Sequence, residues 1–125
     1  MRHSTFVLAA ALAALALAAA LAACGSKDIQ TPTGTIDIAR DQAAKAEIMM
    51  VKTGVTAYVQ LNGLAPAAAD QATLGSFVQP WPENPWTKAP MKPGKEPGDI
   101  VYAPGAGTAY TLGVVVSDGT VYNAP

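Results

Sequence analysis

Two residue types that often carry chemistry in proteins are almost missing from this chain. It has one histidine, His3, and one cysteine, Cys24, in 125 residues. A single cysteine cannot form a disulfide within the chain. With no imidazole after position 3, the rest of the chain cannot build His-based acid–base catalysis, Ser-His-Asp or Cys-His nucleophile systems, or zinc sites of His and Cys.

Charged residues are few and scattered. They make up 14% of the chain, and the formal net charge is −1. There is no basic run, which argues against nucleic-acid binding. The acidic residues form no evident catalytic pair, and Gly105-Ala106-Gly107 lacks the rest of a dinucleotide-binding loop. Asp118 and Asp99 offer too few oxygens for calcium. We therefore expect no enzyme activity, no metal site and no cofactor.

The N-terminus has the pattern of a secretory signal. Arg2 and His3 precede an unbroken apolar run, Phe6 to Ala23, which leads directly to Cys24. A basic start, an apolar middle and small residues before a cleavage site are typical of a signal peptide. An uncleaved membrane helix and simple secretion stay open as alternatives, because an apolar run of about 18 residues can just span a bilayer.

The end of this run resembles a lipoprotein signal. Leu21-Ala22-Ala23-Cys24 resembles the lipobox of bacterial lipoproteins in all four positions. The resemblance implies cleavage after Ala23 and a covalent diacylglycerol on Cys24. Acyl chains contribute about 0.8 kcal/mol for each buried CH₂ group, so two or more hold a protein at a membrane. We expect residues 1–23 to be the signal peptide and the mature chain to be lipid-anchored on the extracytoplasmic face of the cell membrane.

The mature chain divides into a tether and one small domain. Residues 24–34 are polar and contain Pro32 and Gly34, so we expect a tether there. Residues 35–125 can bury a single core. Within Ile36–Asn62, two apolar rows at three- and four-residue spacing predict a long helix with a broad apolar face. One row is Ala39, Ala43, Ala46, Met50, Ala57 and Leu61, and the other is Ala44, Ile48, Val51, Val55 and Tyr58.

The predicted helix has recognisable ends. Thr35 or Asp37 can cap its start. Asn62-Gly63 supplies a left-handed stop, and Pro66 prevents the helix from resuming.

Two features inside the helix carry further predictions. Asp41 and Lys45 stand one turn apart in the favourable acid-first order. Gly54 lowers helix stability by about 1 kcal/mol relative to alanine, so we expect a packing contact that needs a small residue.

The segment after the helix changes character twice. Ala67–Val78 is predicted to be a short second helix with its apolar residues inward. Gln79–Gly98 contains six prolines, which exclude a helix or a central strand. We expect an ordered loop there, pinned by Trp81 and Trp86.

The C-terminal part is predicted to be β. Asp99–Ala103 and Thr108–Val116 have the composition and alternation of strands. Asp118-Gly119 indicates a two-residue hairpin turn into a last strand, Thr120–Asn123. The fold class expected is α+β, a long N-terminal helix packed on a small antiparallel β-meander, since neither element can bury its apolar side alone.

The order of these elements, and the residues at their ends and turns, resemble those of the major pseudopilins of type II secretion and the related type IV pilin-like proteins. The helix exit, Tyr58–Pro66, resembles a pattern of that family. The pattern is a Tyr, any three residues, Asn-Gly, any two residues and a Pro. The loop resembles its Pro-x-(Asp/Asn)-Pro-(Trp/Tyr) run, and the segments Gly98–Tyr102, Tyr110–Leu112 and Ser117–Gly119 resemble its last strands and final turn. The residues that carry the resemblance, here called the signature residues, are Tyr58, Asn62, Gly63, Pro66, Pro82, Pro85, Trp86, Asp118 and Gly119.

This resemblance implies a pilin-like domain over residues 35–125. It also implies a non-enzymatic role through protein contacts, with partners in a type II secretion or type IV pilus-type assembly. The family's prepilin-peptidase site, a Gly before the cut and a Glu at the fifth mature position, is replaced here by the lipobox. The alternative is a lipid-anchored binding module that takes a small ligand or cell-wall component on the loop Gln79–Gly98. A hydrolase is disfavoured because the chain lacks a recognisable set of catalytic residues.

Overall fold

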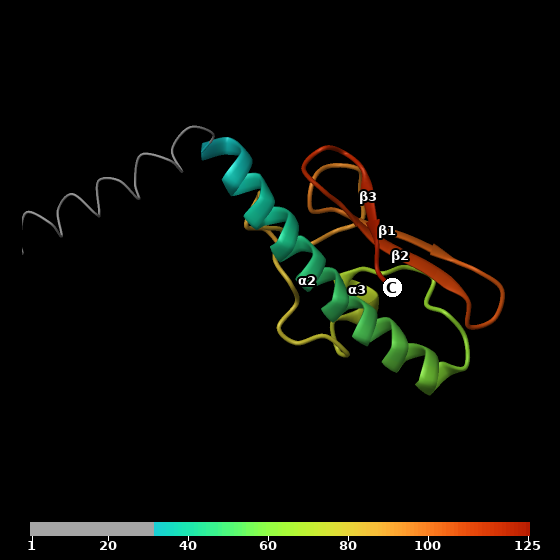
Figure 1. Cartoon of the computed structure of the whole chain (residues 1–125). Coiled ribbons are helices and arrows are strands. Elements are labelled where there is room, and N and C mark those ends of the chain that lie inside the picture. Colours follow the sequence, from blue (N-terminus) through green and yellow to red (C-terminus); the bar gives the residue numbers. More distant parts are fainter. Residues whose placement is uncertain (1–31) are drawn as a thin grey trace, which may run out of the picture. The chain divides into compact units, whose positions relative to one another are not determined.

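The structure is a computed structural model that describes residues 32–125. The predicted signal peptide, the cleavage point after Ala23, the lipid site at Cys24 and most of the tether lie outside the described residues. Residues 37–125 form a compact unit that holds the sheet and the core. Its elements are shown in Figure 1: α2 (Pro32–Asn62), α3 (Gln71–Leu74), β1 (Ile100–Pro104), β2 (Tyr110–Val115) and β3 (Val121–Asn123).

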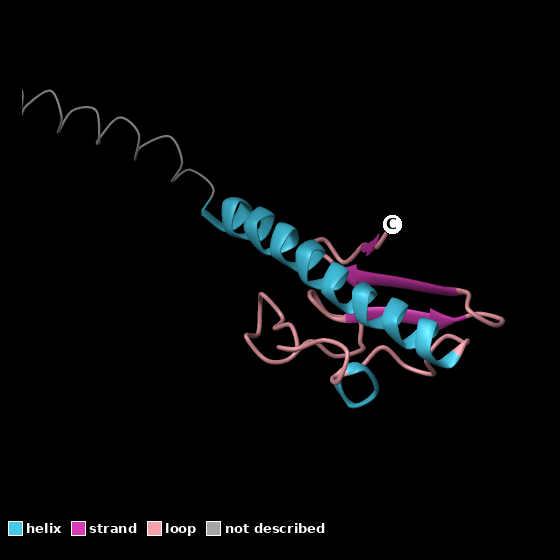
Figure 2. Ribbon diagram, turned by 90° about the horizontal axis from the view of Figure 1, so that it is seen from below, coloured by secondary structure: helices cyan, strands magenta, loops and turns pink. Residues whose placement is uncertain are grey.

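The predicted α+β class is confirmed. One long helix accompanies a three-stranded antiparallel sheet with the order β1-β2-β3. Val114 faces Ile100 on one side and Tyr122 on the other, which makes it the centre of the sheet. Figures 1 and 2 place the strands along one side of α2.

Helix α2 begins earlier than the sequence analysis predicted. It starts at Pro32, four residues before Ile36, so the expected tether is helical from that point. The reason is that proline loses nothing in the first turn, where its missing N–H would have no helical partner. Thr35 and Asp37 therefore lie inside the helix instead of capping it. Asp37 pairs with Arg40 at 3.8 Å across one turn.

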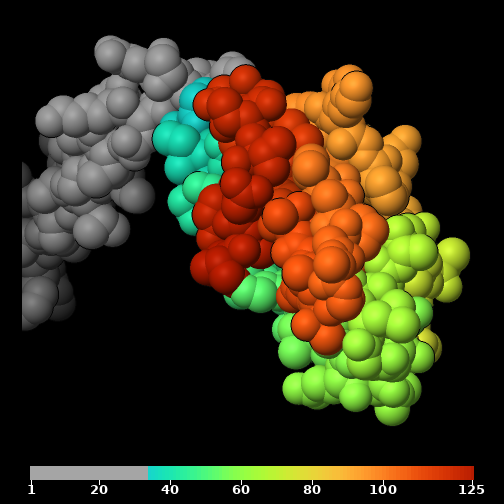
Figure 3. All heavy atoms as spheres, turned by 90° about the vertical axis from the view of Figure 1, so that its right-hand side faces the viewer, coloured from blue at the N-terminus to red at the C-terminus, as the bar shows by residue number. Residues whose placement is uncertain are grey.

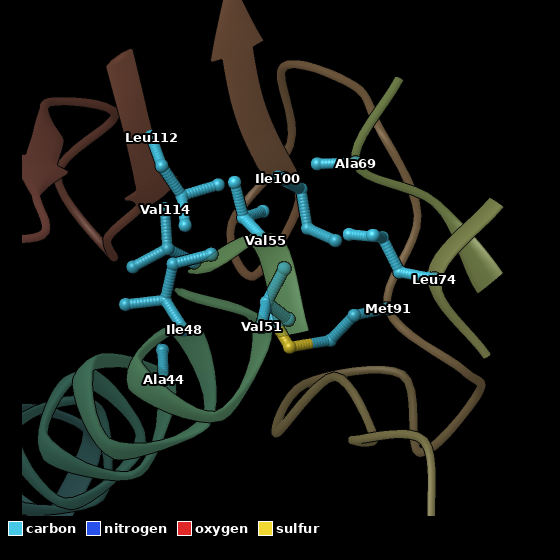
Figure 4. Packing of buried hydrophobic residues seen from close by; sticks show 10 residues of the cluster. All are labelled: Ala44, Ile48, Val51, Val55, Ala69, Leu74, Met91, Ile100, Leu112 and Val114. Carbon is cyan, nitrogen blue, oxygen red and sulfur yellow. The ribbon is translucent and has the colours of Figure 1, made fainter. Parts of the chain in front are cut away.

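The core forms between one row of α2 and the central strand. Ile48, Val51 and Val55 are fully buried and pack with Leu112 and Val114 of β2. Figure 4 shows these side chains pointing toward one another, with Leu74, Met91 and Ile100 closing the cluster. Burial of a Val, Ile or Leu side chain stabilises the fold by about 1.5–3 kcal/mol, so this row anchors the helix.

The predicted broad apolar face of α2 is only half correct. The row with Ile48 and Val55 is buried, whereas most of the other row is exposed, including Ala43, Ala46 and Leu61. Leu61 exposes 76% of its surface. A single three-stranded sheet lies against one side of a helix, so no described element covers the row that contains Ala43, Ala46 and Leu61.

The second helix is much shorter than predicted. Instead of Ala67–Val78, α3 covers only Gln71–Leu74, capped by Asp70, whose carboxylate accepts from the Thr73 amide at 2.8 Å. Leu74 and Val78 are buried as expected. The chain leaves the helix after Leu74 so that Phe77 and Val78 can pack beside Gly54 of α2.

Residues 79–98 form the predicted ordered loop. The Trp81 indole donates to the carbonyl of Met91 at 2.9 Å, which joins the start of the loop to its second half. Met91 itself is buried in the core cluster. None of the helices within residues 32–125 is both long and apolar enough to cross a bilayer.

Candidate functional site

The helix exit is built by the first group of signature residues. Gly63 has a positive φ of 73° and donates its N–H to the Val59 carbonyl at 2.8 Å. The Asn62 side-chain amide donates to the Tyr58 carbonyl at 2.9 Å. These bonds satisfy carbonyls that a helix end leaves unpaired, so the predicted stop is confirmed.

The same exit is fastened to the sheet. Pro66 is fully buried, and its carbonyl accepts the hydroxyl of Tyr102 on β1 at 2.6 Å. Burial, together with the neighbouring Tyr110 and Tyr58 hydroxyls, raises the pKa of Tyr102 above its ordinary value. The Tyr110 ring lies 6.1 Å from that of Tyr102. Tyr102 ends the segment that resembles the family's strand, but its bond to Pro66, 36 residues away, was not predicted.

Tyr58 joins the exit to the segment after α3. Its ring meets Phe77 edge-on, with the centroids 5.8 Å apart and the planes at 69°. One turn earlier, a Cβ on Gly54 would collide with the Cγ2 of Val78. The prediction that Gly54 serves a close packing contact is therefore confirmed.

The second group of signature residues surrounds Asn84, which occupies the (Asp/Asn) position of the Pro-x-(Asp/Asn)-Pro-(Trp/Tyr) run but was not counted among the signature residues. Asn84 is 3% exposed, and its side-chain oxygen accepts from the amides of Trp86 and Thr87 at 2.8 and 3.3 Å. Its side-chain nitrogen donates to the Pro97 carbonyl at 2.9 Å. An Asn-Pro dipeptide often starts a turn, and that signal could have identified it.

Glycine is required next to this asparagine. Gly98 has a φ of +86°, and a Cβ there would collide with the Asn84 side chain. Gly98 also donates to Val115 at 2.8 Å, at the entry to β1. Asn84, flanked by Pro82 and Pro85, therefore connects the loop to the sheet and has its polar atoms satisfied.

The third group forms the last turn, and its predicted geometry is wrong. The Val116 and Thr120 backbones are paired, and Gly119 donates to Val116 at 2.9 Å, so the connection has three residues, Ser117–Gly119. Gly119 takes the positive φ, +83°. This is a type I turn followed by a left-handed glycine, the next most common hairpin after the two-residue form.

The Asp118 carboxylate stabilises this turn. One of its oxygens accepts from the Thr120 amide at 2.9 Å and from the Thr120 hydroxyl at 2.7 Å. These bonds favour the ionised form and lower the pKa of Asp118. Asp118 thus has a local structural role. No group of three or more His, Cys, Asp or Glu residues that could hold a metal ion occurs within residues 32–125.

The last turn is attached to α2 by residues that the sequence analysis assigned elsewhere. Asp41 accepts from both the amide and the hydroxyl of Ser117, each at 2.8 Å. Lys45 places its ammonium 5.1 Å from the centre of the Tyr122 ring. The predicted Asp41–Lys45 pair is therefore replaced by two contacts to the C-terminal hairpin. Figure 3 shows the C-terminal strand, in red, running beside the teal and green turns of α2.

The three groups of signature residues do not converge on one pocket. The helix exit lies at the C-terminal end of α2, whereas the last turn contacts Asp41 near its N-terminal end. The Asn84 loop joins the start of β1. Each group fixes a different junction of the fold.

Two hollows on the described surface are candidates for a ligand site. One hollow of about 320 Å³ lies between Lys52, Tyr110 and the C-terminal residues. Another, of about 230 Å³, borders the proline-rich loop at Asn84, Lys92 and Asp99. Pockets for small molecules usually hold about 300–1,000 Å³. The loop hollow is below that range, and its Asp99 is already engaged by the Glu96 amide at 3.1 Å.

Comparison of the sequence with known protein families and with curated proteins found no match, and comparison of the fold with solved structures found none.

Proposed function

We propose that this chain is a membrane-anchored, pilin-like or pseudopilin-like lipoprotein that works through protein contacts outside the cytoplasm. The single observation that carries the proposal is the order of the fold, a long helix followed by an antiparallel meander, with the signature residues at its junctions. The helix exit contacts Tyr102 of β1, and the Asn84 loop contacts the entry to that strand. In this proposal the signature residues maintain a fold whose surface binds partners of a secretion or pilus-type assembly.

The anchor is the second part of the proposal. The lipobox-like Leu21-Ala22-Ala23-Cys24 would place a diacylglycerol on the only cysteine of the chain. Two or more acyl chains suffice for stable attachment, and no basic or amphipathic membrane signal is needed. The mature domain would then sit on the extracytoplasmic face of the cell membrane.

Mass spectrometry of the N-terminal peptide from purified native protein tests the anchor directly. We expect a mature chain starting at an acylated Cys24, and loss of membrane retention in Cys24→Ser. Ser26→Ala, two residues away, is the matched control and should stay in the membrane fraction. An unmodified Cys24 thiol on a chain free in the medium would refute the anchor.

The protein-contact role needs its own test. Mild crosslinking in the native membrane, followed by identification of linked peptides, should connect residues of the domain to components of a secretion or pilus-type assembly. The alternative binding module rests on the hollow at Asn84, Lys92 and Asp99. Specific nuclear magnetic resonance shifts in those residues on adding peptidoglycan fragments, without protein crosslinks, would favour that alternative.

A further inference from the structure

One face of α2 stays exposed although most of its residues are apolar, and Gln42 is a polar member of it. Ile38, Met49 and Met50 expose 64%, 37% and 40% of their surfaces. Between them lie Ala39, Ala43 and Ala46, also exposed. With 3.6 residues per turn, these alanines form the middle of the face, and Ile38 and Met49 share one of its flanks.

The opposite flank of the same face is charged. Arg40 and Glu47 lie there, two turns apart. Arg40 is bound only loosely within its own helix, because its contact with Asp37 is a 3.8 Å pair between half-exposed side chains. Glu47 lines a hollow of about 300 Å³ with Met50 and Trp81, and the other charged residue of that hollow is Glu83. This part of the surface is acidic and lacks a basic partner among its lining residues.

We propose that this face binds a second copy of the chain, with the two α2 helices antiparallel and the twofold axis near Ala43. In that register Ile38 of each copy faces Met49 of the other, and Ala39 faces Ala46. Arg40 faces Glu47 of the other copy and lies beside its acidic hollow. The pairing is self-complementary, because residues on the same flank of two antiparallel helices meet, and the contact occurs twice.

The antiparallel orientation of the two helices follows from the different chemistry of the two flanks, one apolar and one charged. A parallel pair would bring the charged flank of one helix, Arg40 and Glu47, against the apolar flank of the other, Ile38 and Met49. That arrangement would desolvate charges without partners. The antiparallel register instead matches apolar with apolar and acid with base.

The small area of this face makes the contact weak, so it depends on both copies being held on the same membrane. The face from Ile38 to Met50 is about 18 Å long at 1.5 Å per residue. With a helix about 10 Å wide, a strip of that length covers about 200 Å² on each copy, well below the roughly 1,200 Å² of total area in a stable interface. Attachment to one membrane raises the effective concentration of the copies, so the strength of the contact rests on the proposed anchor.

The anchor is compatible with this geometry. The helix starts at Pro32 of the two copies would lie about 33 Å apart on opposite sides of the axis. Both reach one membrane if the twofold axis is parallel to the membrane normal. Residues 25–31 can span about 23 Å when extended, which leaves room for that orientation.

Cysteine crosslinking in membranes of cells that express the full chain tests the register. Because Ala43 lies near the axis, Ala43→Cys should form a disulfide dimer under mild oxidation, with a 43–43 peptide in the digest. Thr56→Cys, exposed on the same helix but about 20 Å from the proposed axis, is the control and should crosslink about tenfold less. Equal crosslinking of both variants would mean random collision and would overturn the proposal, as would crosslinking of Ala43→Cys to another protein instead.

Charge reversal provides the second arm. Arg40→Glu and Glu47→Arg should each lower the yield of the 43–43 dimer, by about tenfold for two weakened ion pairs. The double variant should restore it, since each copy then presents both reversed charges. Restoration is specific to a second copy in this register, and an unrestored double variant contradicts it. Circular dichroism of all variants should match the wild type.

The wild-type chain separates this proposal from the anchor. Its only cysteine is Cys24. A Cys24–Cys24 dimer in the wild type would show a free thiol and refute lipidation, while the 43–43 peptide and the charge-reversal pattern would still report on the register.

Discussion

The carboxylate of Asp41 accepts both the backbone amide and the hydroxyl of Ser117, which lies 76 positions later in the chain, each at 2.8 Å. This contact attaches the last hairpin turn to the first half of α2. It satisfies a backbone N–H at a turn and a half-buried carboxylate at the same time. Charge-assisted bonds of this kind are the stronger class of protein hydrogen bonds.

The Asp41–Ser117 contact should therefore contribute measurably to stability. Asp41→Ala should lower the free energy of unfolding by about 1–3 kcal/mol, because it leaves two donors of Ser117 without an acceptor. Ser117→Ala should cost less, since the amide bond remains. Urea denaturation of both variants and their double mutant measures the coupling. Gln42→Ala, exposed on the same turn, is the control and should change stability little.

The centre of the sheet should not tolerate a charge. Val114→Asp would place an unpaired carboxylate in a fully buried site between β1, β3 and α2, at a cost of about 3 kcal/mol or more. We expect loss of the cooperative thermal transition. Val121→Asp is the matched control on β3, where the side chain is 41% exposed, and should fold. A wild-type melting temperature for Val114→Asp would contradict the strand assignment.

Gly54 should be irreplaceable despite its poor helix propensity. Gly54→Ala gains about 1 kcal/mol of propensity, but its Cβ would collide with Val78 Cγ2, and overpacking costs about 1–3 kcal/mol. We expect a net loss of stability in denaturant titrations. Combining it with Val78→Ala removes the colliding methyl, so the double variant should be more stable than the sum of the single effects. Gln60→Ala, exposed on α2, serves as the propensity control.

Stability should fall in alkali through Tyr102. Its pKa is raised in the folded protein, mainly by burial, so folding favours the protonated phenol. That contribution is fully present below the unfolded pKa, about 10, and is lost as the pH rises through the higher folded pKa. Melting temperatures of the wild type between pH 9 and pH 11.5 should decline more steeply than those of Tyr102→Phe, which also lacks the bond to Pro66. Parallel curves would argue against this assignment.

The mature chain should not form filaments by itself. In pilin-like proteins an apolar N-terminal helix, continuous with the domain helix, packs in the fibre core, and cleavage before Cys24 would remove the corresponding segment here. Electron microscopy of cells that overexpress the chain should show none. Filaments built from a chain that retains Phe6–Ala23 would refute both this prediction and the lipoprotein proposal.

Several features followed from the sequence because their causes are local. The end of α2 depends on Asn62-Gly63 and on bonds within one turn, and proline alone excludes regular structure from residues 79–98. Alternation predicted a strand over Thr108–Val116, and Leu112 and Val114 of that strand pack in the core. The lipobox-like segment is also a local pattern, and the anchor that it predicts stays a prediction. The start of α2 and the length of α3 were misjudged, because Pro32 is harmless in a first turn and because packing of Val78 beside Gly54 ends the second helix early.

The tertiary structure decided which row of α2 is buried and which distant residues the polar side chains contact. Two apolar rows run along α2 with similar periodicity, and only the position of β2 determines that Ile48 is buried while Ala46 is exposed. Asp41 has an acid-first neighbour in Lys45, yet the hairpin brings Ser117 and Tyr122 to these two side chains. Asn84 and Tyr102 gain their roles from carbonyls of Pro97 and Pro66. Helix propensity and periodicity act within a few residues, whereas the choice among equivalent faces and polar partners is made by whichever distant segment packs there.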